Sequence, residues 1–246
     1  MDRVVYLAAS GAKQILQAQT VNSNNLANAN TTGFQADLAG FDARYLLGPG
    51  LDSRTYSQAE DSGVSFEKGS IESTGRDLDV AVNGDGWIAV QAPDGSEAYT
   101  RAGDLQVNVN GQLLTGAGYP VLGDSGPLVV PEYSKLEFGT DGTISVLPVG
   151  QQATSLAEAG RIKLVSPDPQ QLVKGEDGLL RMSDGSAAPA STQVTLTSGA
   201  LESSNVNSVE ALVNMIDLSR QYDTAVQVMK SADEMDQQSA KMMVLG

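Results

Sequence analysis

The acidic stretch between residues 77 and 85 is the part of this sequence best suited to bind a metal ion. Asp77, Asp79, Asn83 and Asp85 offer carboxylate and amide oxygens, which are the ligands that Ca²⁺ prefers. Their spacing departs from an EF-hand loop, because alanine and valine stand where that loop requires a ligand and a glycine. In a strand, Asp77 and Asp79 would share one face, as on any solvated strand. We therefore predict no metal site here and keep calcium binding as an alternative.

The same aspartates are also the candidates for a catalytic pair of carboxyl groups. No pair of aspartic-protease motifs supports this, because Asp61-Ser62-Gly63 lies in a predicted connector and Asp124-Ser125-Gly126 in a predicted turn. The sequence holds no Gly-Lys-Ser/Thr phosphate loop and no Gly-x-Ser-x-Gly elbow. It also lacks His and Cys, which removes the commonest general base and the thiol nucleophile. We predict that the protein is not an enzyme and takes no cofactor or small-molecule substrate.

The charge of the chain restricts its partners. The formal net charge is −15 over 246 residues, which argues against binding nucleic acid or an anionic lipid surface. No stretch approaches the roughly 20 apolar residues that span a bilayer. The opening residues, Met1–Tyr6, lack a basic region followed by an apolar core. We expect no membrane insertion and no cleavable signal peptide, so the protein is either cytoplasmic or exported by another route.

Asparagine is concentrated in the segment 22–30. Asn forms helices poorly because its side chain competes for backbone hydrogen bonds. One interpretation is a frayed helix end that stops at Gly33, a residue type suited to a C-terminal cap. The other is that the amides bind neighbouring subunits and set their register.

Long helices are predicted at both ends of the chain. All nine prolines lie between Pro49 and Pro189, and proline is the residue least compatible with a helix interior. In the head and the tail, apolar and small residues recur at alternating spacings of three and four, as in a coiled-coil seam. The predicted interaction residues of the head are Val5, Ala8, Ala12, Ile15, Asn22, Asn24, Asn25, Leu26, Asn28, Gly33 and Phe34. Those of the tail are Ala211, Met215, Leu218, Tyr222, Ala225 and Met229.

The two helices are expected to pair with each other and with neighbouring copies. A helix over 207–243 would be roughly 55 Å long, which is too long to fold back onto a small domain over its whole length. The head seam consists of small residues, so its burial is weak at about 25 cal/mol per Å². We infer that both ends are mobile in a monomer and become ordered when copies pack together. The alternative is an ordinary helical hairpin that closes one globular domain.

The middle of the chain is predicted to be β. Leu78, Val80 and Val82 alternate with polar residues, and a Gly-rich turn then leads into the apolar run 87–90. Asn-Gly or Asp-Gly pairs, which are strong turn signals, begin at residues 94, 110, 141, 177 and 184. Regularly spaced short strands with no helical pattern between them are typical of a sandwich or barrel-like module.

The predicted fold class is therefore α+β with four segments. Residues 1–33 and 201–246 form the N- and C-terminal helices, which pair as a coiled-coil-like domain. Residues 34–75 form an extended or hairpin connector, and residues 76–200 form the all-β domain. Within that domain, the segment 149–159 is predicted to be a surface loop.

Three motifs resemble those of flagellar rod and hook proteins, the axial proteins of the flagellum. The segment Asn24–Phe34, NNLANANTTGF, resembles the amino-terminal signature of that family. The segment Gly69–Trp87 resembles the start of the β domain of rod proteins. The segment Gly199–Val206, running into Val209–Ile216, resembles their carboxy-terminal helix. Together the motifs cover most of the chain, and the one departure is Ala29-Asn30, where the family often has a Ser- or Val-type residue.

The resemblance implies a structural subunit of the bacterial flagellar basal-body rod. It implies assembly with copies of itself and other rod proteins, contact with the basal-body ring, and export by the flagellar type III apparatus into the periplasm. It also implies that the terminal helices line a helical tube that transmits torque, with the β domain outside.

Two alternatives to this interpretation remain open. Within the family, the opening residues Met1–Tyr6 and the modest length are most like a proximal-rod subunit, and a distal-rod subunit is the alternative. The alternative from another class is a calcium-dependent β-sandwich adhesin with a helical stalk.

Overall fold

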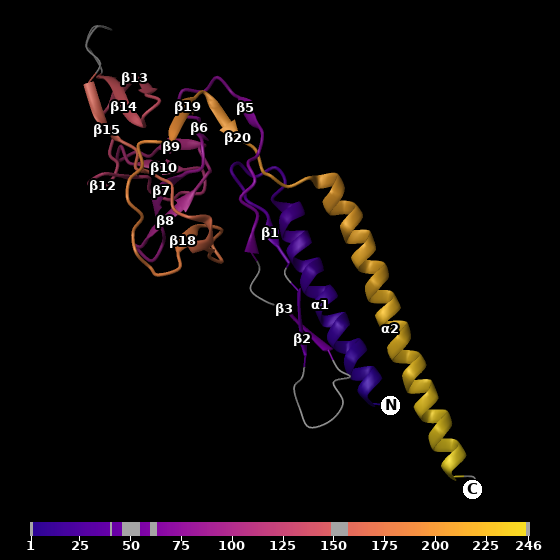
Figure 1. The fold of residues 1–246 in the computed structure, drawn as a ribbon. Helices are drawn as coiled ribbons and strands as arrows, with labels where there is room; N and C mark the ends of the chain where they lie inside the picture. Colours follow the sequence, from indigo (N-terminus) through magenta and orange to yellow (C-terminus); the bar gives the residue numbers. More distant parts are fainter. Residues whose placement is uncertain (1, 40, 46–54, 60–62, 149–156, 245–246) are drawn as a thin grey trace. The chain divides into compact units, whose positions relative to one another are not determined.

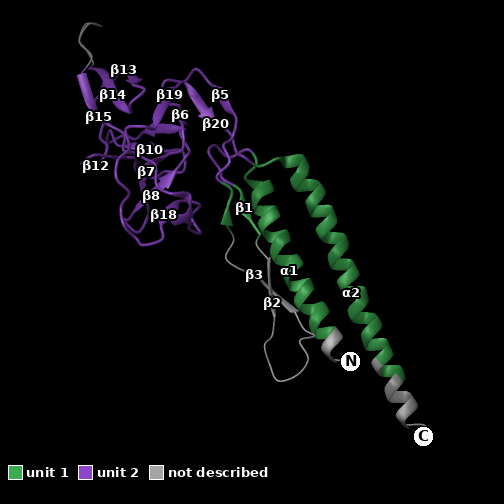
Figure 2. Cartoon of the chain, in the orientation of Figure 1, with its two compact units in different colours: residues 1–29, 36–65, 206–246 green, residues 30–35, 66–205 purple. Residues whose placement is uncertain are grey.

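The structure is a computed structural model and describes residues 2–39, 41–45, 55–59, 63–148 and 157–244. The chain has an α+β fold, with a long helix near each end and short strands between them (Figure 1). It divides into two compact units (Figure 2). We call residues 1–29, 36–65 and 206–246 the helical unit, and residues 30–35 and 66–205 the β module. No helix in the described ranges combines the length and the apolar character needed to cross a membrane.

Two helices dominate the helical unit, namely α1, Asp2–Ala27, and α2, Ser208–Val244. They pack against each other within the single chain. Asn207 caps α2, because its Oδ1 accepts hydrogen bonds from the amides of Val209 at 3.1 Å and Glu210 at 3.3 Å. This cap satisfies amide groups that the first turn of a helix leaves without a partner.

Helix α1 ends at Ala27 and not at Gly33, which the sequence suggested as its cap. The side chain of Asn28 donates a hydrogen bond to the carbonyl of Asn24 at 2.9 Å. The side chain of an asparagine thus bonds a carbonyl of the last helical turn. In a helix that ends with a glycine cap, backbone amides would bond such carbonyls. Gly33 itself lies in the β module, with a φ of 64°.

Residues 36–65 add two short antiparallel pairs to the helical unit. Strand β1, Asp37–Leu38, pairs with β4, Gly63–Val64. Between them, β2, Phe41–Tyr45, pairs with β3, Thr55–Ala59. Residues 40, 46–54 and 60–62 of the predicted connector lie outside the described residues.

The β module contains the remaining strands, each two to six residues long. They are β5 Ile71–Ser73, β6 Val80–Asn83, β7 Trp87–Gln91, β8 Glu97–Thr100, β9 Leu105–Val107, β10 Leu113–Thr115, β11 Leu122–Gly123, β12 Gly126–Pro127, β13 Tyr133–Phe138, β14 Thr143–Pro148, β15 Ala157–Arg161, β16 Leu164–Val165, β17 Leu172–Lys174, β18 Leu180–Met182, β19 Thr195–Ser198 and β20 Ala200–Glu202. One short 3₁₀ helix, Pro169–Gln171, precedes β17.

These strands form several small antiparallel sheets. The largest has five strands in the order β16-β7-β8-β18-β17, and a second has the order β13-β14-β15. The other described strands of the module occur in pairs, such as β6 with β19 and β5 with β20. The described strands do not close into a barrel, so the predicted sandwich or barrel-like form is not confirmed, whereas the β-rich middle is.

One apolar core runs through the β module. Alternate residues of β6 and β7 supply fully buried side chains, including Val80, Ile88 and Val90. Later strands complete the core with residues such as Leu105 and Ile144. Because each buried aliphatic side chain contributes about 1.5–3 kcal/mol, this module contains the main hydrophobic stabilisation of the described chain.

The turn signals in the sequence are confirmed. The glycine of each predicted Asn-Gly or Asp-Gly turn has a positive φ, the conformation that other residues avoid. At one such turn, Asp94 accepts hydrogen bonds from the hydroxyl and the amide of Ser96, at 2.6 and 2.9 Å. These bonds lower the pKa of the Asp94 carboxyl.

Two predictions about local structure are wrong. Asp77 and Asp79 do not share a strand face, because a turn closed by the bond from the Asp79 amide to the Arg76 carbonyl (3.0 Å) precedes β6. Asp77 is exposed and Asp79 is buried. In the predicted loop 149–159, residues 149–156 lie outside the described residues, and residues 157–159 belong to β15, which pairs with β14.

Tyr99 lies on the central strand of the five-stranded sheet, and its phenol group both accepts and donates a hydrogen bond. The oxygen accepts a hydrogen bond from the amide of Ala188 at 2.7 Å, and the hydroxyl donates to Glu97 Oε1 at 3.1 Å. Lys163 Nζ lies 2.8 Å from both carboxylate oxygens of Glu97. Burial disfavours the phenolate and raises the pKa of Tyr99 to about 12.

The raised pKa predicts an alkaline limit to the stability of the β module. The ordinary pKa of 10.0 applies to the unfolded chain, so Tyr99 contributes its full stabilisation below pH 10. That contribution is lost as the pH rises toward about 12. In Tyr99→Phe, the free energy of unfolding should be lower by about 1–3 kcal/mol at pH 7, because the buried Ala188 amide loses its acceptor. The gap between wild type and variant in urea melts should narrow from pH 10 to 12, and curves that stay parallel would contradict the assignment.

Candidate assembly interface

The fully buried side chains of α1 and α2 are small. Within the described side chains of the two helices, the buried residues are Ala12, Ala18, Ala211 and Ala232. Alanine allows two helices to approach closely, but it buries little apolar area at about 25 cal/mol per Å². The fully buried positions therefore contribute little apolar burial to the helix pair.

The predicted seam positions lie on the less exposed side of each helix. On α1, Ala12 is buried, and the half-buried positions are Val5, Ala8, Ile15, Asn22 and Leu26. On α2, Ala211 is buried, and the half-buried positions are Met215, Leu218, Tyr222, Ala225 and Met229. The two helices contact each other. The coiled-coil-like pairing of these two rows is not confirmed, and their role in contacts between subunits stays a prediction.

The asparagine-rich segment bonds largely within its own chain. Asn22 Nδ2 donates to the carbonyl of Ala211 on α2 at 2.7 Å. The Asn25 side chain bonds the backbone of Asp37 twice, as donor to the carbonyl at 2.8 Å and as acceptor from the amide at 2.9 Å. These amides therefore tie α1 to α2 and to β1. The contact of these asparagines with a neighbouring subunit stays a prediction, and among them Asn24 has an exposed side chain.

Gly33 and Phe34 belong to the β module and not to either helix. The amide of Gly33 donates to the carbonyl of Glu202 at 2.8 Å. A Cβ atom on Gly33 would lie 2.3 Å from the carbonyl carbon of Arg101, so no larger residue fits. The ring of Phe34 faces Lys174, with Nζ 4.1 Å from the ring centroid.

The buried tryptophan holds the same segment. The indole Nε1 of Trp87 donates to Gln35 Oε1 at 3.2 Å. The ring of Phe66 meets Trp87 edge-on, with the centroids 5.9 Å apart. Trp87 is the only tryptophan of the chain, so its environment reports whether residues 34–35 are in place.

An ion pair that sequence reasoning missed lies beside this segment. Arg101 and Glu202 have side chains only 2% and 3% exposed, and Nε lies 2.7 Å from Oε2. Arg101 also donates to the carbonyls of Gly86 at 3.0 Å and Val82 at 3.3 Å. The second carboxylate oxygen of Glu202 accepts from the amide of Gly69 at 3.0 Å.

No local pattern in the sequence indicates this pair. Its members are separated by 101 positions, so no local spacing connects them. Glu202 stands in the motif Gly199–Val206, but charged residues are ordinarily exposed. Only the contact of distant strands reveals that both charges are buried together.

The acidic stretch considered for calcium does not converge on one point. Asp79 is bonded by the hydroxyl of Thr74 at 2.6 Å and lies 3.0 Å from Arg76 Nε. Asp85 is exposed and pairs with Lys68 at 2.8 Å. The Asn83 amide donates to the hydroxyl of Thr197 at 2.5 Å. In the described part of the chain, no three His, Cys, Asp or Glu side chains are placed to hold a metal ion.

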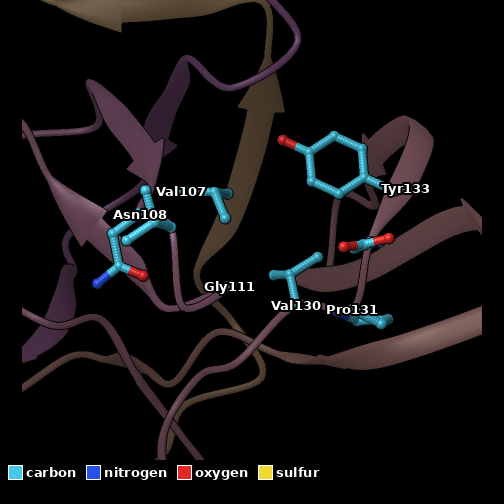
Figure 3. Close-up of a pocket in the computed structure, with 8 residues that line it drawn as sticks. Val107, Asn108, Gly111, Val130, Pro131 and Tyr133 are labelled. Carbon is cyan, nitrogen blue, oxygen red and sulfur yellow. The ribbon is translucent and has the colours of Figure 1, made fainter.

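An open cleft of about 340 Å³ lies between the turn after β9 and the segment before β13 (Figure 3). Its lining includes the apolar side chains of Val107, Val130 and Pro131 and the ring of Tyr133. Glu132 is the only carboxylate in the lining. A single carboxylate does not make the acid and base pair discussed above, so this cleft supports no catalytic assignment.

Three family models match separate parts of the chain. The model described as flagella basal body rod protein matches residues 6–35. The flagellar hook protein FlgE/F/G D1 domain matches residues 81–146. The flagellar basal body rod FlgEFG protein C-terminal model matches residues 197–242. These matches fall on α1 and the segment after it, on the β module, and on β20 with α2.

Relatives match over nearly the whole chain. The flagellar basal-body rod protein FlgF of Escherichia coli K12 is 41% identical over 240 residues, which are 95% of each chain. The FlgF protein of Caulobacter vibrioides is 33% identical over 98% of each chain. The FlgG protein of Buchnera aphidicola subsp. Schizaphis graminum is 33% identical over 94% of this chain and 97% of its own.

The hydrogen bonds of the asparagine-rich segment predict different effects for two adjacent substitutions. Asn25→Ala removes both bonds to the half-buried backbone of Asp37 and should lower the opening free energy of the helical unit by about 1–3 kcal/mol. Hydrogen exchange of the α1 amides measures this loss. Asn24→Ala is the matched control, because it changes an exposed side chain at the same helix end and should stay within about 0.5 kcal/mol of wild type. Equal effects of the two substitutions would contradict the assignment.

Proposed function

Because this chain belongs to the flagellar basal-body rod protein family, we propose that it forms the proximal part of the rod. It is a structural subunit of the flagellar basal-body rod and assembles with other rod components. In the proximal rod, copies of the chain would join by contacts that do not close into a ring, which builds a helical tube. Such a tube would transmit torque toward the distal rod.

An uncovered apolar stripe on α2 carries this proposal. Val209, Leu212, Val213 and Ile216 are large apolar residues that are at least half exposed. They follow helical spacings of three and four, on a side of α2 other than that of the buried Ala211. Water-exposed stripes of this kind mark interaction surfaces. The occupant that fits best is a terminal helix of a neighbouring rod subunit, in a coiled-coil arrangement.

The weak helix pair supports assembly-dependent ordering. Its buried residues are alanines, whereas the β module buries Trp87, Ile88 and Leu105. The helical unit of an isolated subunit would thus be close to its unfolding limit, since long helices gain most of their stability from packing. Neighbouring subunits would supply the missing apolar contacts. The chain would then travel through the type III export apparatus with unfolded ends and order them in the rod.

Two finer assignments follow from the same proposal. The 41% identity to the FlgF of Escherichia coli exceeds the 33% identity to the FlgG of Buchnera aphidicola, which favours the proximal over the distal rod. A chain without cysteine suits the oxidising periplasm, where it would contact the basal-body ring. The adhesin alternative has no support from the family or from the acidic stretch.

A charge in the stripe should abolish rod assembly. Ile216 is 54% exposed, so Ile216→Asp costs the monomer little, but it would bury an unpaired carboxylate in the assembled rod. In a strain that lacks the chain, this variant should fail to restore swimming, whereas the wild type restores it. In the purified full chain, the melting temperature of the β module should not change.

The matched control adds the same charge elsewhere on α2. Gln221 is exposed and polar, and Gln221→Asp should restore swimming fully. If Ile216→Asp also swims normally, the stripe is not an assembly surface. If neither variant nor wild type restores swimming, the assignment as a rod subunit fails.

Limited proteolysis tests the ordering of the terminal helices. In the purified monomer, protease should cut α1 and α2 much faster than the β module, because few buried contacts oppose local opening. In isolated basal bodies, the same sites should resist cleavage. Terminal helices as resistant as the β module in the monomer would refute ordering on assembly.

A further inference from the structure

The buried ion pair of Arg101 and Glu202 has more partners than a simple salt bridge. Through side-chain and backbone groups, it contacts segments around residues 33, 69, 82–86 and 202. Each carboxylate oxygen of Glu202 has its own donor, Arg101 Nε at 2.7 Å and the Gly69 amide at 3.0 Å. The pair is therefore a fully bonded centre to which several distant parts of the chain are attached.

Three of these segments, around residues 33, 69 and 202, lie next to the points where the chain passes between the two units. It leaves the helical unit after residue 29, returns after 35, leaves again after 65 and returns after 205. We call residues 30–35, 66–70 and 202–205 of the β module the junction. The three stretches of the junction meet at Glu202, whose backbone carbonyl bonds Gly33 and whose carboxylate bonds Gly69.

Backbone hydrogen bonds connect the three stretches directly. The Gly33 amide donates to the Glu202 carbonyl at 2.8 Å, and the Asn205 amide donates to the Phe34 carbonyl at 3.2 Å. The side chain of Asn205 donates to the carbonyl of Glu67 at 2.9 Å. The segment between α1 and β1 and the segment that precedes α2 are thus held in one fixed register within the β module.

Stability alone does not explain a buried ion pair at this place. Removing two charges from water is costly, and apolar residues of similar volume often stabilise a fold as well or better. The well-attested benefit of such a pair is that it selects one arrangement over others. Here the arrangement it selects is the register of the junction.

We infer that Arg101 and Glu202 are positioning residues for assembly, which fix the register of the chain segments leading to α1 and α2. The inference rests on the proposed function, because the register matters for subunits whose terminal helices must pack with neighbours. It assigns the pair a role in rod formation that is separable from the folding of the β module. Gly33 also contributes to the register of the junction, since only glycine fits against the Arg101 carbonyl.

The test replaces both charges with apolar side chains in the full chain, as Arg101→Met with Glu202→Leu. We expect the melting temperature of the β module to stay within about 5 °C of wild type. The amides of Gly33 and Gly69 should exchange at least about tenfold faster, because they lose the centre that orders them. Swimming should be lost in the strain that lacks the chain. A double variant that swims normally, or whose β module no longer melts cooperatively, would overturn the inference.

Two controls separate the junction from general effects of charge and glycine. Lys163→Met with Glu97→Gln removes another largely buried ion pair of the same module and should leave swimming intact. Gly33→Ala should abolish swimming with the ion pair still present. Gly75→Ala has a similar φ of 70° but no atoms within 4 Å of the added Cβ, so it should swim.

The outcomes of these variants are distinct. If Gly33→Ala swims as well as Gly75→Ala, the register of the junction is unimportant and the inference fails. If the wild-type chain itself does not restore swimming, the proposed function fails. If wild type and double variant both restore it, only the positioning role is refuted.

Discussion

The carboxylate of Glu202 and the guanidinium of Arg101 are both removed from water, and each charge is neutralised mainly by the other. Burial of this kind is tolerable only when the remaining donors and acceptors are also satisfied. The carbonyls of Gly86 and Val82 and the amide of Gly69 meet that requirement. Strand β6 and the turn that follows it, the segment before β5 and the end of β20 must therefore hold fixed positions around the pair. The docking of Gly33 against Arg101 depends on the same arrangement.

The two units of the chain differ in how they are stabilised. The β module buries large side chains such as Trp87 and Leu105, and its turns are held by glycines and aspartates. The helical unit buries alanines and leaves large apolar residues such as Ile216 in water. Since apolar burial is the main favourable term in folding, the first unit is suited to persist alone and the second to gain stability from neighbours. This division fits a protein that is a structural subunit of a larger assembly.

The asparagine-rich signature has an intrachain role that accounts for much of its composition. The side-chain amide of Asn22 bonds the backbone of Ala211 in α2, and that of Asn25 bonds the backbone of Asp37 in β1. An amide offers a donor and an acceptor together, which is why Asn25 can satisfy both backbone groups of one residue. A helix end that would otherwise fray is thereby fastened to its neighbours.

The sequence by itself determined the helical ends, the β-rich middle, the turn positions and the family. The absence of proline from both ends, the spacing of the seam residues and the Asn-Gly or Asp-Gly pairs are local signals. Such signals act over short stretches of chain and do not depend on tertiary contacts. The NNLANANTTGF segment sufficed to indicate the rod family because its residues are contiguous. Tertiary structure alone decided that Asp79 is buried while Asp77 is exposed, that residues 157–161 form a strand, and that Arg101 meets Glu202. Each of these depends on contacts with other segments of the chain. The strand and helix periodicities of a sequence show which residues share a face, but they do not show which distant segments come into contact.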